Sequence, residues 1–97
     1  MEVQYIHIKD FCSGHNIEEA FIIGLQEYKL IELSLIGDKQ FIYIEELPKV
    51  EKMVRLHRDL HINLEGIEAI HHLLERTMEL QNEIQTLKKQ LGRYGQF

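Results

Sequence analysis

Apolar residues recur every seven positions over the last third of the chain, and this spacing constrains the fold more than any other feature of the sequence. A seven-residue repeat places these side chains on one stripe of an α-helix, as in a coiled coil. Because glutamine and lysine fill the later turns, the helix is too polar to fold back on its own domain, and we expect it to dimerise. The predicted contact residues are Ile70, Leu73, Thr77, Leu80, Ile84, Leu87 and Leu91.

The helix is expected to begin after Asn63, whose side chain is a typical N-cap, and to end at Gly92, a typical C-cap. We therefore divide the chain into a core domain, residues 1–62, and a C-terminal dimerisation helix, residues 63–97. The residues after Gly92 are expected to fray. The stripe covers only about three heptads, and Thr77 interrupts it. We therefore expect the helix alone to form only a weak dimer.

The core domain opens with a short helix pattern. After a strand-like alternation, the stretch YIHIKDFCSGHN places Ile8, Phe11 and Cys12 on one helix face. Cys12 is the only cysteine, which excludes an internal disulfide and favours a buried, reduced thiol. Asn16 is then expected to cap a second helix over residues 17–30, in which acidic residues of the first turn suit the helix dipole. A helix, a tight break and a second helix are typical of a helix-turn-helix.

A hairpin and a third helix follow. Two runs rich in β-branched and aromatic residues flank GDKQ, residues 37–40, and predict a two-stranded hairpin, or wing, over residues 31–44. Pro48 fits the first turn of a helix over residues 45–60. The stretch RLHRDLHINLEGIEAI, residues 55–70, is then expected to form a helix–helix corner in which Gly66 allows close approach. The apolar residues predicted to pack this corner are Leu56, Leu60, Ile62, Leu64, Ile67 and Ile70.

This order of elements is that of a MerR-type winged helix-turn-helix. The chain resembles the chaperone modulator CbpM family of small MerR-like proteins, through RLHRDLHINLEGI at residues 55–67 and the heptad-patterned LQNEIQTLKKQLGRY at residues 80–94. The resemblance implies a mainly α fold: a MerR-like winged helix-turn-helix with a small β-hairpin wing and a long C-terminal helix. Members of this family bind the J-domain of a DnaJ/CbpA-type co-chaperone and inhibit its stimulation of DnaK. The resemblance therefore implies a bacterial, cytoplasmic chaperone modulator that is not an enzyme.

The charge distribution is compatible with such a partner. Residues 17–46 carry seven acids, Glu18, Glu19, Glu27, Glu32, Asp38, Glu45 and Glu46, against the two bases Lys29 and Lys39. J-domains present a basic helix, so an acidic surface would speed encounter with it. We predict a docking face with an acidic rim and tyrosine anchors. Its residues are Glu18, Glu19, Glu27, Tyr28, Glu32, Asp38, Tyr43, Arg55, Arg58 and Asp59.

Each of these residues also has an ordinary structural explanation. The two tyrosines would equally serve as core residues and the acids as solubilising charges. Arg55, Arg58 and Asp59 would equally form an exposed salt-bridge set of little energetic value. The sequence alone leaves these alternatives open.

A MerR-family transcriptional regulator that binds DNA is the alternative function. MerR-type regulators contact DNA with the second helix and the wing, and carboxylates there oppose the attraction to phosphate that DNA affinity requires. DNA binding is therefore disfavoured, but basic residues of the third helix leave a route to it open. These are Lys49, Lys52, Arg55 and Arg58. The orientation of the dimer also stays open, because MerR-type helices pair antiparallel whereas Glu83 facing Lys88 favours a parallel pair.

No metal, cofactor or catalytic site is expected. His57 and His61 have a spacing that can hold zinc, and His71 and His72 follow, but nothing in the sequence supplies the remaining ligands of a zinc site. Phosphate-binding loops, nucleophile elbows and paired catalytic carboxylates do not occur in the sequence. The sequence shows no signal peptide and no apolar run of the roughly 20 residues that a membrane span needs, which favours the cytoplasm.

Overall fold

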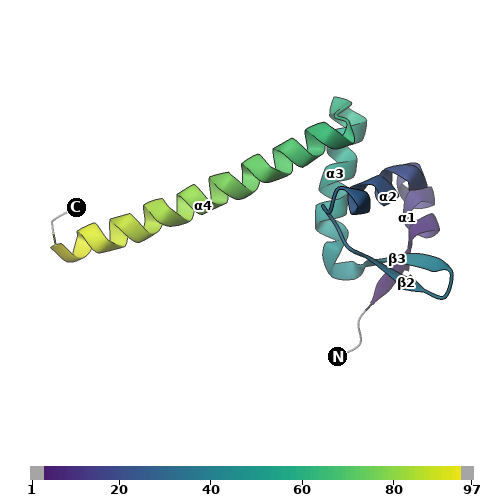
Figure 1. The fold of residues 1–97 in the computed structure, drawn as a ribbon, viewed down its shortest axis with the longest axis horizontal. Helices are drawn as coiled ribbons and strands as arrows, with labels where there is room; N and C mark the ends of the chain where they lie inside the picture. Colours follow the sequence, from purple (N-terminus) through teal and green to yellow (C-terminus); the bar gives the residue numbers. More distant parts are fainter. Residues whose placement is uncertain (1–3, 95–97) are drawn as a thin grey trace.

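The computed structural model describes residues 4–94, which form a small body of helices and strands and one long helix that leaves it (Figure 1). In chain order the elements are β1 (Tyr5–His7), α1 (Ile8–His15), α2 (Glu19–Glu27), β2 (Leu33–Ile36), β3 (Lys39–Tyr43), the short 3₁₀ helix η1 (Ile44–Glu46), α3 (Leu47–Leu60) and α4 (Leu64–Tyr94). This order confirms the mainly α fold with a hairpin wing and a long C-terminal helix.

The sheet has one strand more than predicted. Strands β2 and β3 form the expected antiparallel hairpin, joined by a turn in which Gly37 adopts a φ of 65°, a conformation that glycine accepts without strain. The turn is shorter than the predicted GDKQ segment, because Lys39 and Gln40 already pair within the hairpin. Strand β1 pairs antiparallel with the free edge of β3, so the order is β1-β3-β2.

One face of this sheet packs on the helices. Ile42 on β3 is fully buried, and its cross-strand partners Ile6 and Leu33 also pack against the core. Since side chains alternate along a strand, Phe41 and Tyr43 lie on the opposite face. The core joins all the helices to this inner sheet face. It comprises Ile8, Phe11, Cys12, Phe21, Ile22, Leu25, Leu30, Ile31, Ile42, Val50, Met53, Val54 and Ile67.

The prediction that Asn16 caps the second helix is wrong. Asn16 instead ends α1 in the left-handed conformation (φ 52°, ψ 51°), and the Ile17 N–H donates to the Cys12 carbonyl at 3.0 Å. Asparagine tolerates this conformation better than most residues, which makes it a good helix terminator. Helix α2 therefore begins at Glu19, and it ends at Glu27, before the predicted residue 30, because Lys29 takes a positive φ of 61°.

The corner between α3 and α4 agrees with most of its prediction. His61 ends α3 in the left-handed conformation, and the Asn63 side chain accepts a hydrogen bond from the Gly66 N–H at 2.8 Å, which confirms the N-cap. A Cβ atom on Gly66 would lie 2.7 Å from Ile62 Cγ2, which confirms the close approach. The predicted packing of Leu60 is wrong: it is 64% exposed, because the chain turns away at the next residue and leaves it uncovered.

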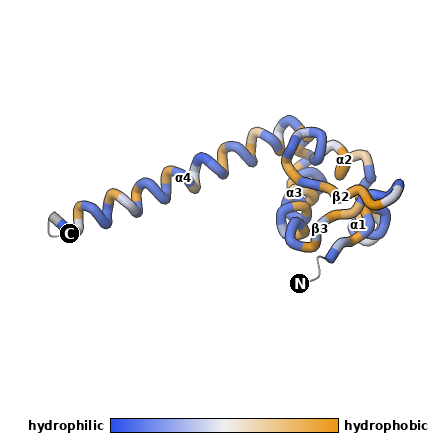
Figure 2. The backbone as a smooth tube through the Cα atoms, turned by 60° about the horizontal axis from the view of Figure 1, so that its bottom comes forward, coloured by the Kyte–Doolittle hydropathy of each residue, from blue (hydrophilic) through white to orange (hydrophobic). Residues whose placement is uncertain are grey.

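Helix α4 extends away from the body, and apolar residues recur along its length (Figure 2). Ile67 in its first turns is only 1% exposed, whereas residues 72–93 are all exposed. The predicted C-cap at Gly92 is wrong, since the helix continues to Tyr94. A single glycine costs a helix only about 1 kcal/mol relative to alanine, which its neighbours tolerate. The predicted fraying falls on residues 95–97, outside the described residues. Within residues 4–94, no helix is long and apolar enough to cross a membrane.

The left-handed conformation of Asn16 can be tested by substitution. We expect Asn16→Ala to be less stable than Asn16→Gly by about 1 kcal/mol, because alanine pays a steric cost in this conformation and glycine does not. The free energy of unfolding in urea of the two variants measures the difference. Equal stabilities of the two variants would contradict the left-handed conformation of Asn16.

Candidate partner-binding surfaces

The predicted docking residues do not form one patch. Glu19 and Asp38 line a shallow hollow between the start of α2 and the hairpin turn, together with Lys9 and Lys39. Because two lysines balance two acids there, this surface is electrically mixed. It is also the side on which a winged helix-turn-helix presents its second helix and its wing, and it lacks the excess of positive charge that binding to phosphates requires.

A second hollow brings Glu18 of the α2 entry beside Arg58 of α3. The Arg58 guanidinium donates a hydrogen bond to the His15 carbonyl at 2.6 Å, which ties α3 to the end of α1. Arg55 and Asp59 are exposed on α3. Among the ion pairs found within residues 4–94, none includes Arg55, Arg58 or Asp59, so the alternative of a mutual salt-bridge set has no support there.

The histidines have separate surroundings. The His57 ring stacks on Phe21, with ring centroids 4.3 Å apart, and its Nδ1–H donates to the Ile62 carbonyl at 2.8 Å. His61 lies in the turn that ends α3, so the two histidines do not share one helix face. His71 and His72 both lie near Glu75 on α4. Within the described part of the chain, no three histidine, cysteine or acidic side chains converge as metal ligands would.

Tyr28 links the end of α2 to the start of α4. It packs against the core, and its hydroxyl donates to Glu65 Oε1 at 2.5 Å. This hydrogen bond, with a second from the backbone N–H of Glu65, holds the pKa of the Glu65 carboxyl below its usual value. The hydrogen bond to Glu65 is also the main cause of a raised pKa of the Tyr28 hydroxyl, and partial burial is the second cause. The contact gives Tyr28 a structural role, and Glu27 lies exposed beside it.

Tyr43 and Glu32, by contrast, lie together at the outer face of the sheet. The Tyr43 ring lies 5.2 Å from the ring of Tyr5, which is itself 6.1 Å from the ring of Phe41. Glu32, Glu45 and Glu46 line one hollow with Tyr43. Tyr5, Phe41, Glu45 and Glu46 are not among the predicted docking residues, although Phe41 lies within the predicted hairpin and the two acids directly follow it.

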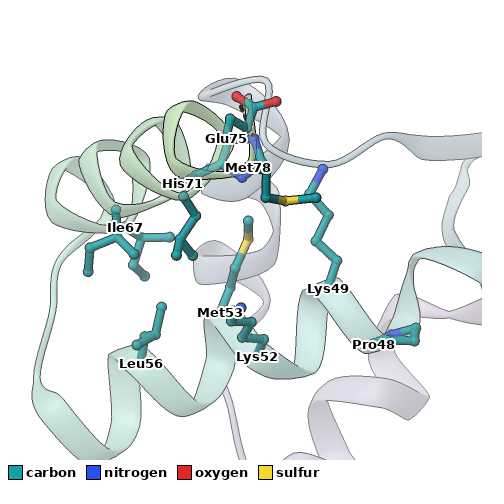
Figure 3. Close-up of a pocket in the computed structure, with 11 residues that line it drawn as sticks. Pro48, Lys49, Lys52, Met53, Leu56, Ile67, His71, Glu75 and Met78 are labelled. Atoms are coloured by element: carbon teal, nitrogen blue, oxygen red, sulfur yellow. Dashed lines mark ion pairs between the residues drawn. The ribbon is translucent and has the colours of Figure 1, made fainter. Parts of the chain in front are cut away.

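A groove between α3 and α4 is a further surface that the sequence analysis missed (Figure 3). It has a volume of about 370 Å³, and Met53 and Leu56 of α3 point toward Ile67 and Met78 of α4 across it. Lys49 and Lys52 lie at its α3 side. Met78 lies outside the heptad positions, so a strict seven-residue search does not find it. The helical spacing of the apolar residues in both helices was the available signal.

The groove leads directly into the predicted dimerisation stripe. Ile70 and Leu74 line the groove, and the stripe continues from there along α4. Its large apolar side chains are 42% to 66% exposed in the single chain: Leu73, Leu80, Ile84, Leu87 and Leu91. Thr77 is satisfied within the helix, since its hydroxyl donates to the Leu73 carbonyl at 2.8 Å. Such a long exposed apolar stripe is typical of an interface with another molecule.

The helix-turn-helix, the hairpin and the long terminal helix define a winged helix-turn-helix protein. The family model described as "MerR HTH family regulatory protein" matches residues 6–89, and the chain belongs to that family. The curated relatives include "Chaperone modulatory protein CbpM" of Pseudomonas entomophila, 25% identical, and its counterpart in Pseudomonas putida, 26% identical, each over 94% of this chain and 91% of the relative. These relatives confirm the resemblance to the CbpM family. Both names describe regulators and not enzymes. No solved structure matches the chain significantly.

The Tyr28–Glu65 contact predicts a pH-dependent stability. Because the folded-state pKa of Glu65 is lowered, its contribution is present above the unfolded-state pKa and is lost as the pH falls through the folded value. We expect Tyr28→Phe to be less stable than the parent near neutral pH, and this difference to shrink below about pH 4. Urea unfolding at both pH values measures it. Tyr5→Phe is the matched control, and a pH-independent difference for Tyr28→Phe would contradict the assignment.

Proposed function

We propose that the chain is a chaperone modulator that binds the J-domain of a DnaJ/CbpA-type co-chaperone and inhibits its stimulation of DnaK in the cytoplasm. The observation that carries this proposal is the charge of the surface on which a winged helix-turn-helix binds DNA. On that surface Glu19 and Asp38 offset Lys9 and Lys39. Similarity to proteins named chaperone modulatory protein CbpM, over nearly the whole chain, supports the same conclusion.

Charge complementarity explains how such a partner would be recruited. The predicted acidic residues Glu18, Glu19, Glu27, Glu32 and Asp38 are all exposed. They are spread over α2, the hairpin and the segments beside them, so they act together as a negative field over this part of the body. A negative field raises the rate at which a basic helix arrives, and salt screens it. A modulator that occupies the basic helix of a J-domain would thereby keep it from DnaK.

The direct test is a calorimetric titration of this protein against the J-domain of a DnaJ-like protein from the same organism, at low and at moderate salt. We expect saturable binding that weakens as salt rises, and inhibition of the DnaK ATPase stimulated by that J-domain over the same concentration range. A titration with duplex DNA at low salt is the control for the alternative function. Salt-sensitive DNA binding without J-domain binding would overturn the proposal in favour of a transcriptional regulator.

A second copy of this chain is the other partner that we propose. Pairing of two α4 helices would cover the exposed stripe, in line with the predicted division of the chain at residues 62 and 63. We favour an antiparallel pair because it places the tip of one helix over the apolar groove at the base of the other. In that register Ile70 packs opposite Leu87 of the second copy, and Arg76 lies opposite its Glu83, which forms two attractive pairs per dimer.

The dimer and its orientation can be tested separately. We expect Ile84→Glu to give a monomer in sedimentation equilibrium, because a charge replaces an apolar contact in the stripe, whereas Gln85→Glu beside it stays a dimer. A monomeric parent protein would overturn the proposal.

For orientation, a spin label on Lys89→Cys reports the distance between the helix tips. An antiparallel pair places the two labels more than about 30 Å apart, given the helical rise of 1.5 Å per residue, and a parallel pair places them side by side. Cys12 should not react with the label, since it is buried and desolvation raises the pKa of its thiol.

A further inference from the structure

The outer face of the three-stranded sheet carries an aromatic cluster that lies outside the hydrophobic core. We define this cluster as Tyr5, His7, Phe41 and Tyr43. The cross-strand pairs Tyr5 with Tyr43 and His7 with Phe41 place all four side chains on one face of β1 and β3. The rings of neighbours in the cluster lie 5.2 Å to 6.1 Å apart. Tyr5 is 39% exposed, and the others are partly buried.

The hydrophobic core does not account for this cluster. The core and the side chains packed against it draw on the inner sheet face, through Ile6, Leu33 and Ile42. Within residues 4–94, they include no member of the aromatic cluster. The hairpin extends the outer face with Ile36, which is 49% exposed. Aromatic side chains gathered on a sheet face outside the core have the composition of a binding hot spot.

Three acids border the cluster. Glu32, Glu45 and Glu46 line one hollow with Tyr43, and no cationic side chain lines it. Three other hollows contain predicted docking acids, and each includes a cation: Lys9 and Lys39 in one, Arg58 in another, and Lys29 beside Glu32 in the third. In addition, Glu46 Oε2 is buried and has no hydrogen-bond partner among the described residues. A buried carboxylate oxygen without a donor is costly, so a donor from a bound partner would satisfy it.

We infer that the outer face of the sheet, with the aromatic cluster at its centre and Glu32, Glu45 and Glu46 at its edge, is the docking surface for the basic helix of the J-domain. This inference rests on the proposed function and identifies the surface that performs it. Lysine and arginine side chains suit both parts of the surface. Their cationic groups bind aromatic faces and pair with carboxylates, while their aliphatic stems cover the rings.

This surface differs from the surroundings of the predicted docking acids Glu18 and Glu19. Glu18 and Glu19 each share a hollow with cations, and Glu19 reaches the cluster at His7, away from the three acids at its edge. We therefore expect them to contribute to the long-range field and not to the contact. The field is screened beyond about 8 Å at physiological salt, whereas a desolvated contact persists. The distinction predicts which substitutions retain their effect when salt is added.

The test compares two variants of the surface with one matched control, by calorimetry against the J-domain at about 0.15 M salt. The surface variants are Tyr43→Ala and Glu45→Lys, and the control is Glu18→Lys, which makes the same charge change on an exposed residue outside the surface. We expect each surface variant to weaken binding roughly tenfold or more, and the control to weaken it less than about threefold. Circular dichroism and thermal melting verify the folds, and Glu45→Lys serves alone if Tyr43→Ala does not fold.

A second measurement locates the contact without changing the surface. The chain contains four tyrosines, so 3-fluorotyrosine labelling gives four fluorine signals that Tyr→Phe variants assign. We expect the signals of Tyr5 and Tyr43 to shift when the J-domain binds, and that of Tyr28, which faces Glu65, to stay in place.

The outcomes separate the two proposals. Both proposals are supported if the parent protein binds the J-domain, the surface variants bind it more weakly, and the fluorine signals of Tyr5 and Tyr43 shift. Parent protein that binds while Tyr43→Ala and Glu45→Lys bind equally well overturns the sheet surface and leaves the proposed function standing. Stronger weakening by Glu18→Lys than by Glu45→Lys would also overturn it, in favour of α2. A parent protein that does not bind the J-domain overturns both.

Discussion

The turn between α3 and α4 determines the shape of the whole molecule. It is built from a left-handed residue, His61, and from hydrogen bonds that satisfy the backbone on both sides: the Ile62 N–H donates to the Leu56 carbonyl, and the Asn63 side chain caps α4. Ile67 then packs into the core one turn later, which holds the first turns of α4 on the body. From there a straight helix can only leave the body, so the turn keeps the apolar stripe exposed and ready for another molecule.

In this fold, the residues that build the core are not the residues that decide what the protein binds. Apolar residues on α1, α2, α3 and the inner sheet face build the winged helix-turn-helix, and none of them contacts solvent enough to decide what the protein binds. Exposed charge decides that instead. Replacing the basic residues that phosphate contacts require by a mixture of acids and lysines leaves the core unchanged, since surface charges contribute little to stability. A DNA-binding scaffold can therefore change its partner without changing its fold.

Local patterns in the sequence predicted the elements well, but they could not show which of the predicted docking residues lie together in the fold. The hairpin, the Asn63 cap and α4 each depend on signals within a few residues of one another. Asn16 was misplaced because the same side chain suits a helix start and a left-handed helix end, and only the neighbouring geometry decides between them. The pairing of β1 with β3, and the hollow that joins Glu32 to Glu46, depend on residues distant in sequence. In FIY, residues 41–43, both sheet faces are apolar, so alternation could not tell that Ile42 is buried while Tyr43 remains free for a partner.

The two surfaces proposed for partners lie on different elements. The proposed docking surface lies on the outer face of the sheet, centred on β1 and β3. The apolar stripe lies on α4, which leaves the body at the end of α3 opposite to the sheet (Figure 1). Binding at one surface therefore need not displace the other. An antiparallel α4 pair would also carry the two sheets far apart, so each copy would hold its own J-domain and the dimer would bind two without competition. A dimeric or clustered co-chaperone would then gain avidity from the second site, provided that its own spacing matches that of the two sheets.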